Sequence, residues 1–287
     1  MTKNIILVLI AALFTVSCSL NKLVVGQMTP VLEKSADALY EESDLQLAEQ
    51  ALAANLKLLE GLLKNDPENE ELHLLLAQGY AGYALGFVED EDPKRAAGFY
   101  QRAFNFGVNV LTEQFYSDWQ WSKENIRKLD SIIDDSEEDD LPELFWTTFA
   151  LAGQINVSLS DPAALSRVPM IEKMITKIEQ LDDSFFYGTV YLMKGAIAGL
   201  KPKMLGGNPE VALSSFNKNI EMTGGNFLLS YVYKARFYAA KTLDDQLFDQ
   251  LISEIEQAEN GPKELTLFNQ IARKKAALLK SKKEDLF

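Results

Sequence analysis

Apolar residues recur at intervals of three and four along nearly the whole chain, which is the spacing of amphipathic helices. From Thr29 to Leu286 no stretch alternates apolar and polar residues with the period of two that indicates a strand. Helix starts are marked by a residue that can cap a helix, followed directly by proline, at Asp66-Pro67, Asp92-Pro93, Asp161-Pro162 and Asn208-Pro209. The pattern therefore predicts an all-α fold.

Small residues occupy matching places on four of the predicted helices, at Ala77, Ala150, Gly195 and Ala235. This placement resembles the tetratricopeptide repeat, in which small residues let paired helices approach and bulky ones, such as Phe216 here, fill the gaps. Because the spacing is uneven, we expect an irregular tetratricopeptide-like (TPR-like) helical repeat solenoid that forms a single domain over residues 28–287. An unrelated α-helical globule is the alternative.

The segment Gly206-Gly207-Asn208-Pro209 has the composition of a tight turn between two helices. The two glycines permit a positive φ, Asn208 can cap a helix and Pro209 can begin it. No Gly-Lys-Ser or Gly-Lys-Thr sequence follows, so the pattern does not match a phosphate-binding loop. We therefore expect a structural turn.

The first residues have the pattern of an export signal. Residues 5–16 form an apolar run that is too short to cross a bilayer but suits a signal peptide. The small residue Ser17 directly before Cys18 resembles a bacterial lipobox, in which the cysteine is acylated. Cys18 is also the only cysteine in the chain, so it has no partner for an internal disulfide.

These features predict a lipoprotein signal peptide over residues 1–17 and an acylated tether over residues 18–27. We expect a periplasm-facing protein, anchored to the inner or the outer membrane by lipidated Cys18. An ordinary signal peptide followed by a chance cysteine is the alternative.

The net charge of the chain narrows the classes of partner that it can bind. The formal net charge of −14 argues against nucleic acid, whose phosphates would repel the chain. Acidic residues gather in two runs, residues 89–92 and 134–140, which are typical of solvated loops. Neither run has the spaced glycine of a calcium loop, and cation binding by the second run stays open.

Residue types for catalysis are scarce. His73 is the only histidine and the only cysteine is assigned to acylation, so the sequence offers no Cys–His pair and no conventional Ser–His–Asp triad. A zinc site built from Cys and His is excluded for the same reason. We therefore expect a protein that binds rather than catalyses and that needs no cofactor.

Aromatic residues cluster on or near the first helices of the repeats, which line the concave face of a solenoid. Most must belong to the core, but a few that face inward would build an apolar channel for a hydrophobic ligand or an extended peptide. The candidates for this face are Tyr80, Trp146, Tyr191 and Tyr231. Arg236 could neutralise a ligand carboxylate, and an ion pair between packed helices is its alternative role.

Three stretches resemble the T component associated with periplasmic tripartite (TRAP) transporters, the TatT family. They are residues 84–89 with 96–107, residues 201–212, and residues 227–239. The resemblance implies a tetratricopeptide-like fold with an apolar hole or cleft, and hydrophobic organic acids as ligands. It also implies a TRAP-type periplasmic solute-binding protein as partner and a homo-oligomer such as a trimer.

Together these observations predict a periplasmic, non-enzymatic lipoprotein of a TRAP-type uptake system. It would hold a hydrophobic small molecule, dock the solute-binding protein, or do both. The alternative is a protein-interaction scaffold of the cell envelope that holds no small molecule. A hydrolase that depends on two carboxylates is a more distant alternative.

Overall fold

The computed structural model describes residues 31, 34–115, 118–200 and 207–287, which are mainly helical and include no strand. The predicted all-α fold is confirmed. After a helical segment at residues 34–40, the α-helices, π-helices (η1, η4) and 3-10 helices (η2, η5) are α2 (Leu45–Leu63), α3 (Glu70–Tyr83), η1 (Ala84–Val88), α4 (Pro93–Thr112), α5 (Lys123–Asp135), η2 (Glu138–Asp140), α6 (Leu141–Asn156), α7 (Pro162–Leu165), α8 (Val168–Asp182), α9 (Phe185–Gly188), α10 (Val190–Gly199), α11 (Pro209–Met222), α12 (Leu229–Lys234), η4 (Ala235–Ala239), α13 (Ala240–Thr242), α14 (Asp245–Gln257), η5 (Lys263–Leu265), α15 (Thr266–Ser281) and α16 (Lys283–Leu286).

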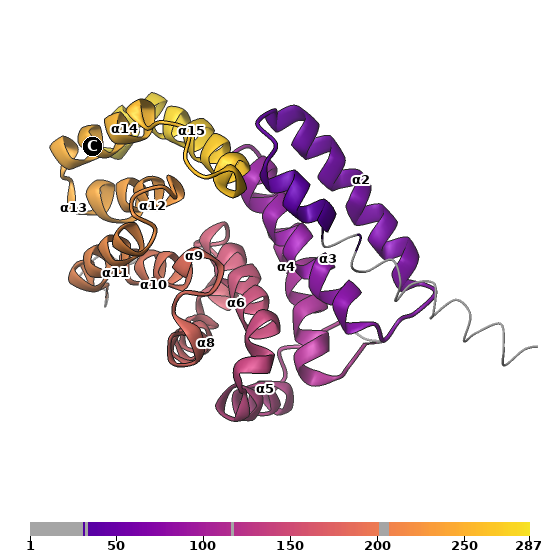
Figure 1. The fold of residues 1–287 in the computed structure, drawn as a ribbon. Coiled ribbons are helices and arrows are strands. Elements are labelled where there is room, and N and C mark those ends of the chain that lie inside the picture. Colours follow the sequence, from indigo (N-terminus) through magenta and orange to yellow (C-terminus); the bar gives the residue numbers. More distant parts are fainter. Residues whose placement is uncertain (1–30, 32–33, 116–117, 201–206) are drawn as a thin grey trace, which may run out of the picture.

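The helices follow one another round an arc (Figure 1). Neighbours along the chain pack on each other, as α3 does on α4, α4 on α6, and α10 on α11. The last long helix, α15, drawn in yellow, returns beside α2, drawn in indigo. The contact between α15 and α2 closes the arc into a ring.

Capping residues begin several helices as the sequence predicts. Asp92 accepts a hydrogen bond from a backbone N–H in the first turn of α4, and Pro93 is the first residue of that helix. The prediction at Asp66-Pro67 is wrong, because these residues belong to the turn before α3. The cap of α3 is Asn69, whose side chain also donates to the Asp66 carboxylate.

The four small positions lie where helices meet closely. Ala77, Ala150 and Ala235 have no exposed surface. A Cβ atom at Gly195 would lie 2.6 Å from a ring carbon of Phe216, so a larger residue would not fit between α10 and α11 at their present distance. The close helix contacts expected from the sequence are present, while their assignment to a tetratricopeptide-like repeat stays a prediction.

The interpretation of the two acidic runs as solvated loops is confirmed only in part: residues 89–91 form a turn whose first residue is buried, and the acidic residues of the second run are exposed but partly helical. Glu89, directly after η1, is only 6% exposed. In the second run, residues 134 and 135 end α5 and residues 138–140 form η2, where Asp140 accepts a hydrogen bond from the N–H of Glu137 at 2.8 Å. Local charge pattern does not reveal which carboxylates a distant helix will cover.

Several predictions fall on residues that the structure does not describe. The signal peptide, Cys18 and the tether lie outside the described residues, and so does Gly206 of the expected turn. Asn208 accepts a hydrogen bond from the N–H of Val211 at 3.1 Å, and Pro209 is the first residue of α11. None of the described helices combines the length and the apolarity that crossing a bilayer requires.

Candidate functional site: an apolar cavity inside the ring of helices

An apolar cavity lies inside the ring. Its walls come from residues 34–40 and from α2, α3, η1, α6, α9, α10, α12 and α15. The cavity has a volume of about 120 Å³ and opens into a wider space of about 1180 Å³ that includes open solvent. An engineered apolar cavity of roughly 150 Å³ binds benzene, so this cavity has about the size of one small apolar group. Because both ends of the chain supply walls, the closing of the ring creates the cavity.

Aromatic rings form much of the lining. The centroid of the Phe268 ring lies 4.9 Å from that of Tyr40, and 5.7 Å from those of Phe186 and Phe227. Aliphatic side chains fill most of the remaining wall, and they come chiefly from α2, α3, α10 and α15. Apolar surface removed from water contributes roughly 25 cal/mol per Å², so an apolar molecule would be stabilised in this space.

A few polar groups interrupt the wall. Gln78 donates a hydrogen bond to the hydroxyl of Tyr40. Tyr233 also lines the cavity, and burial, and next the negative charge of Glu89, raise the pKa of its hydroxyl far above the usual value. The Tyr233 hydroxyl therefore stays protonated. A small number of placed polar groups in an apolar wall is what orients a ligand in a binding pocket.

A more open pocket, called the vestibule below, adjoins the cavity. The two spaces share Tyr40, Gln78, Trp146 and Phe186. The other residues that line the vestibule are Asp37, Glu41, Leu74, Pro142, Phe185, Tyr187 and Glu264. The rings of Trp146 and Phe186 have centroids 4.7 Å apart and stand at the boundary between the two spaces.

The backbone at this boundary is strained. Phe186 has φ 44° and ψ 59°, and Tyr187 has φ 60° and ψ 27°, so α9 is not a regular helix. Gly188 follows with φ 62°. Left-handed backbone costs about 1–2 kcal/mol for each residue that has a Cβ atom. Such strain persists only where the surrounding structure holds it, and it is concentrated at functional sites.

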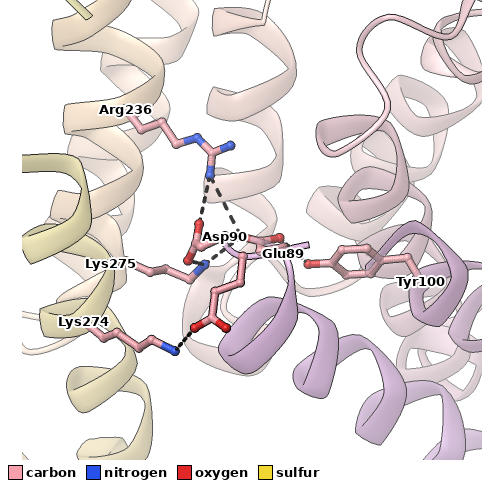
Figure 2. A network of polar contacts seen from close by, with 7 residues as sticks. Glu89, Asp90, Tyr100, Arg236, Lys274 and Lys275 are labelled. Carbon is pink, nitrogen blue, oxygen red and sulfur yellow. Dashed lines mark hydrogen bonds and ion pairs between the residues drawn. The ribbon is translucent and has the colours of Figure 1, made fainter. Parts of the chain in front are cut away.

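A buried cluster of charges joins α15 to the rest of the ring (Figure 2). The ammonium group of Lys275 donates to Glu89 at 2.8 Å and to Asp90 at 2.6 Å, and its side chain is 5% exposed. The hydroxyl of Tyr100 donates to the other carboxylate oxygen of Glu89 at 2.6 Å. Arg236 lies 4.0 Å from Glu89 and 3.9 Å from Asp90. The cluster thus connects segments that are distant in sequence.

Two π-helical segments meet at this cluster. The first, η1, ends directly before Glu89 and supplies Leu85 and Phe87 to the cavity wall. The second, η4, contains Arg236. Single π-helical turns are rare and often occur at functional sites. The first segment therefore joins the charged cluster to the cavity wall, and the second places Arg236 in the cluster.

The structure does not bring the five candidate residues together. Trp146 lines both the cavity and the vestibule. Tyr191 lies outside the cavity lining, and its hydroxyl donates to Asp183 at 2.7 Å. Burial, and next this hydrogen bond, raise the pKa of Tyr191. Tyr231 also lies outside the lining and is half-buried.

Tyr80 and Arg236 take part in helix packing. Tyr80 is 1% exposed, and its hydroxyl donates to Glu60 of α2. Arg236 faces two carboxylates of the charged cluster, which is the alternative role that the sequence analysis gave it. Neither residue lines the cavity.

The sequence analysis did not select Tyr40, Phe186 or Phe268, although all three line the cavity. Phe268 lies on the apolar face of an amphipathic C-terminal helix, and this face was a visible signal. Phe186 belongs to the run Phe185-Phe186-Tyr187, but nothing in the run indicates a left-handed turn, since glycine follows only at residue 188.

The described ranges contain no group of three or more His, Cys, Asp or Glu side chains that could hold a metal ion. In the second acidic run, Asp134 forms an ion pair with Lys173 at 2.9 Å. The cavity is therefore the candidate site that the geometry favours.

Comparison with known proteins matches the chain to a protein family. A search of curated proteins finds no match. A family model described as the TRAP transporter T-component matches residues 41–287, a range that includes α2 to α16. The match associates the chain with a TRAP transport system. The chain belongs to the TRAP transporter T-component family.

Proposed function

We propose that the chain is a non-enzymatic binding component of a TRAP-type uptake system. It holds an apolar molecule in the cavity and exchanges it with a periplasmic solute-binding protein. The cavity supports this proposal most directly. Protein interiors are normally close-packed, and an unfilled apolar space lowers stability, so an apolar cavity that persists points to a ligand.

The chemistry of the lining supports an apolar body for the ligand. The resemblance suggested an organic acid, with Arg236 as the partner of its carboxylate. Arg236 instead faces Glu89 and Asp90, and it does not line the cavity. The proposal therefore rests on the apolar walls, and not on a charge of the ligand.

Membrane attachment is part of the same proposal. Acylated Cys18 would hold the helical body at the inner or outer membrane, facing the periplasm, where a solute-binding protein could reach it. A homo-oligomer such as a trimer would place several cavities beside one another. The support for these points is the pattern of residues 1–18 and the family.

Native mass spectrometry of the purified full chain tests the proposal. We expect the chain to form a complex with a TRAP-type solute-binding protein, and to carry an added small mass that organic solvent extracts. A complex that never carries such a mass would favour the scaffold function instead. A chain that ignores the partner and carries no small molecule would contradict the proposal.

A further inference from the structure

We infer that Asn219 is a positioning residue that holds Phe186 and Tyr187 as an aromatic gate between the vestibule and the cavity. The inference rests on the proposed function, because a gate has meaning only if a ligand passes. Three features carry it: the left-handed turn at residues 186–188, the buried side chain that holds it, and the place of Phe186 between two spaces.

The turn is held through its main chain. The side-chain amide nitrogen of Asn219 donates to the carbonyl of Tyr187 at 2.8 Å and to the carbonyl of Gly188 at 2.7 Å. Its oxygen accepts a hydrogen bond from the hydroxyl of Ser230 at 2.5 Å. Asn219 and Ser230 have no exposed surface. All polar atoms of the Asn219 side chain are therefore engaged, and they tie α9 to α11 and α12.

The strained backbone of residues 186–188 depends on Asn219 to keep its present conformation. Phe186 and Tyr187 have φ angles of 44° and 60°, which bulky residues rarely adopt. Without Asn219 the turn would relax to ordinary negative φ angles, and both rings would leave their present positions. The hydrogen bonds of Asn219 therefore act on the rings through the backbone, and not through contact with a ligand.

The rings of Phe186 and Tyr187 lie at the boundary between the vestibule and the cavity, which is the position that a gate requires. Phe186 lines both the cavity and the vestibule. Its ring centroid lies 4.7 Å from that of Trp146, 6.4 Å from that of Tyr40 and 5.7 Å from that of Phe268. Tyr187 lines the vestibule and stacks on Phe227, a residue of the cavity wall, at 5.6 Å. A molecule that moves past Phe186 from the vestibule to the cavity would displace these rings.

Stopped-flow measurements with the neutral apolar probe N-phenyl-1-naphthylamine test the inference on the full chain. Asn219→Leu removes both donors at similar size, and Phe186→Ala removes the ring and leaves the hydrogen bonds. We expect both variants to accelerate association of the probe by about tenfold, and dissociation by at least as much, because Phe186 is also part of the cavity wall. A purely structural defect would instead lower the amount of probe bound without speeding its binding.

Asn217→Leu is the matched control, because Asn217 lies exposed on the same helix and its side-chain oxygen accepts a hydrogen bond from Lys234 at 2.8 Å. It should leave both rates unchanged. If the Asn219→Leu variant does not fold, the rates measured for Phe186→Ala alone test the gate. Rates like those of the unchanged protein in Phe186→Ala would overturn the gate while leaving the proposed function intact. If the unchanged protein binds no probe, the proposed function and the gate both fail.

Discussion

Replacing Lys275 by methionine should lower the free energy of unfolding by about 3–5 kcal/mol, one of the two largest effects that we expect. Lys275 is the buried cation that pairs with Glu89 and Asp90, and its loss leaves two carboxylates close together with only Arg236, at about 4 Å, to balance them. The Coulombic attraction in this cluster need not exceed the cost of desolvation. Removing one partner is still expensive, because the other charges stay buried.

Denaturant unfolding monitored by circular dichroism measures this effect. Lys280→Met is the matched control on the same helix, since Lys280 pairs with Glu256 at 2.7 Å with both side chains at least half exposed, and its effect should stay within about 0.5 kcal/mol. Adding Glu89→Gln and Asp90→Asn to Lys275→Met should recover roughly half of the loss. Equal effects of the two lysine variants would mean that the cluster does not hold α15 to the ring.

Gly195→Ala should lower the free energy of unfolding by about 2–3 kcal/mol, although alanine is the better helix former. The new Cβ atom would lie 2.6–2.9 Å from three ring carbons of Phe216. Phe216 has no exposed surface, so its ring has no free space into which it can move. Helices α10 and α11 would have to separate, which would loosen the wall of the cavity.

Gly98→Ala is the control for this substitution. Gly98 lies in α4, and a Cβ atom there meets nothing within 4 Å, so the change should stabilise the protein by about 0.5–1 kcal/mol. The double variant Gly195→Ala with Phe216→Leu should recover part of the loss in the same unfolding assay, because the two sites are in contact. A stabilising effect of Gly195→Ala would show that α10 and α11 do not meet as described.

The periodic spacing of apolar residues predicts those features of the fold that depend on residues close together in sequence. Helical spacing of apolar residues gave the all-α fold, and the small residue at Gly195 with the bulky one at Phe216 correctly marked a close helix contact. Both follow from the local requirement that paired helices pack. The same pattern did not distinguish aromatic residues that fill the core, such as Tyr80, from those that line the cavity, such as Trp146. Both kinds lie on the inner face of a helix.

Features that depend on contacts between residues far apart in sequence could not be predicted from the sequence. The acids after η1 looked fully solvated because the sequence does not show that α15 returns to cover Glu89 and pair it with Lys275. Arg236 and these acids were each noted, but nothing local joins them. The left-handed turn at Phe186 and Tyr187 is held by Asn219, and only the folded chain brings the three together.

Filling the cavity tests most directly whether it holds an apolar ligand. Gly82 lines the cavity and a Cβ atom there meets nothing within 4 Å, so Gly82→Phe adds a ring to the space without a clash of its Cβ. Gly98→Phe adds the same ring to an exposed helix position outside the cavity.

Equilibrium titration with N-phenyl-1-naphthylamine compares the two variants with the unchanged protein. We predict that Gly82→Phe weakens binding by about tenfold or more, as the loss of buried apolar contact requires, and that Gly98→Phe leaves it unchanged. A folded Gly82→Phe variant that binds the probe as tightly as the unchanged protein would contradict the central claim.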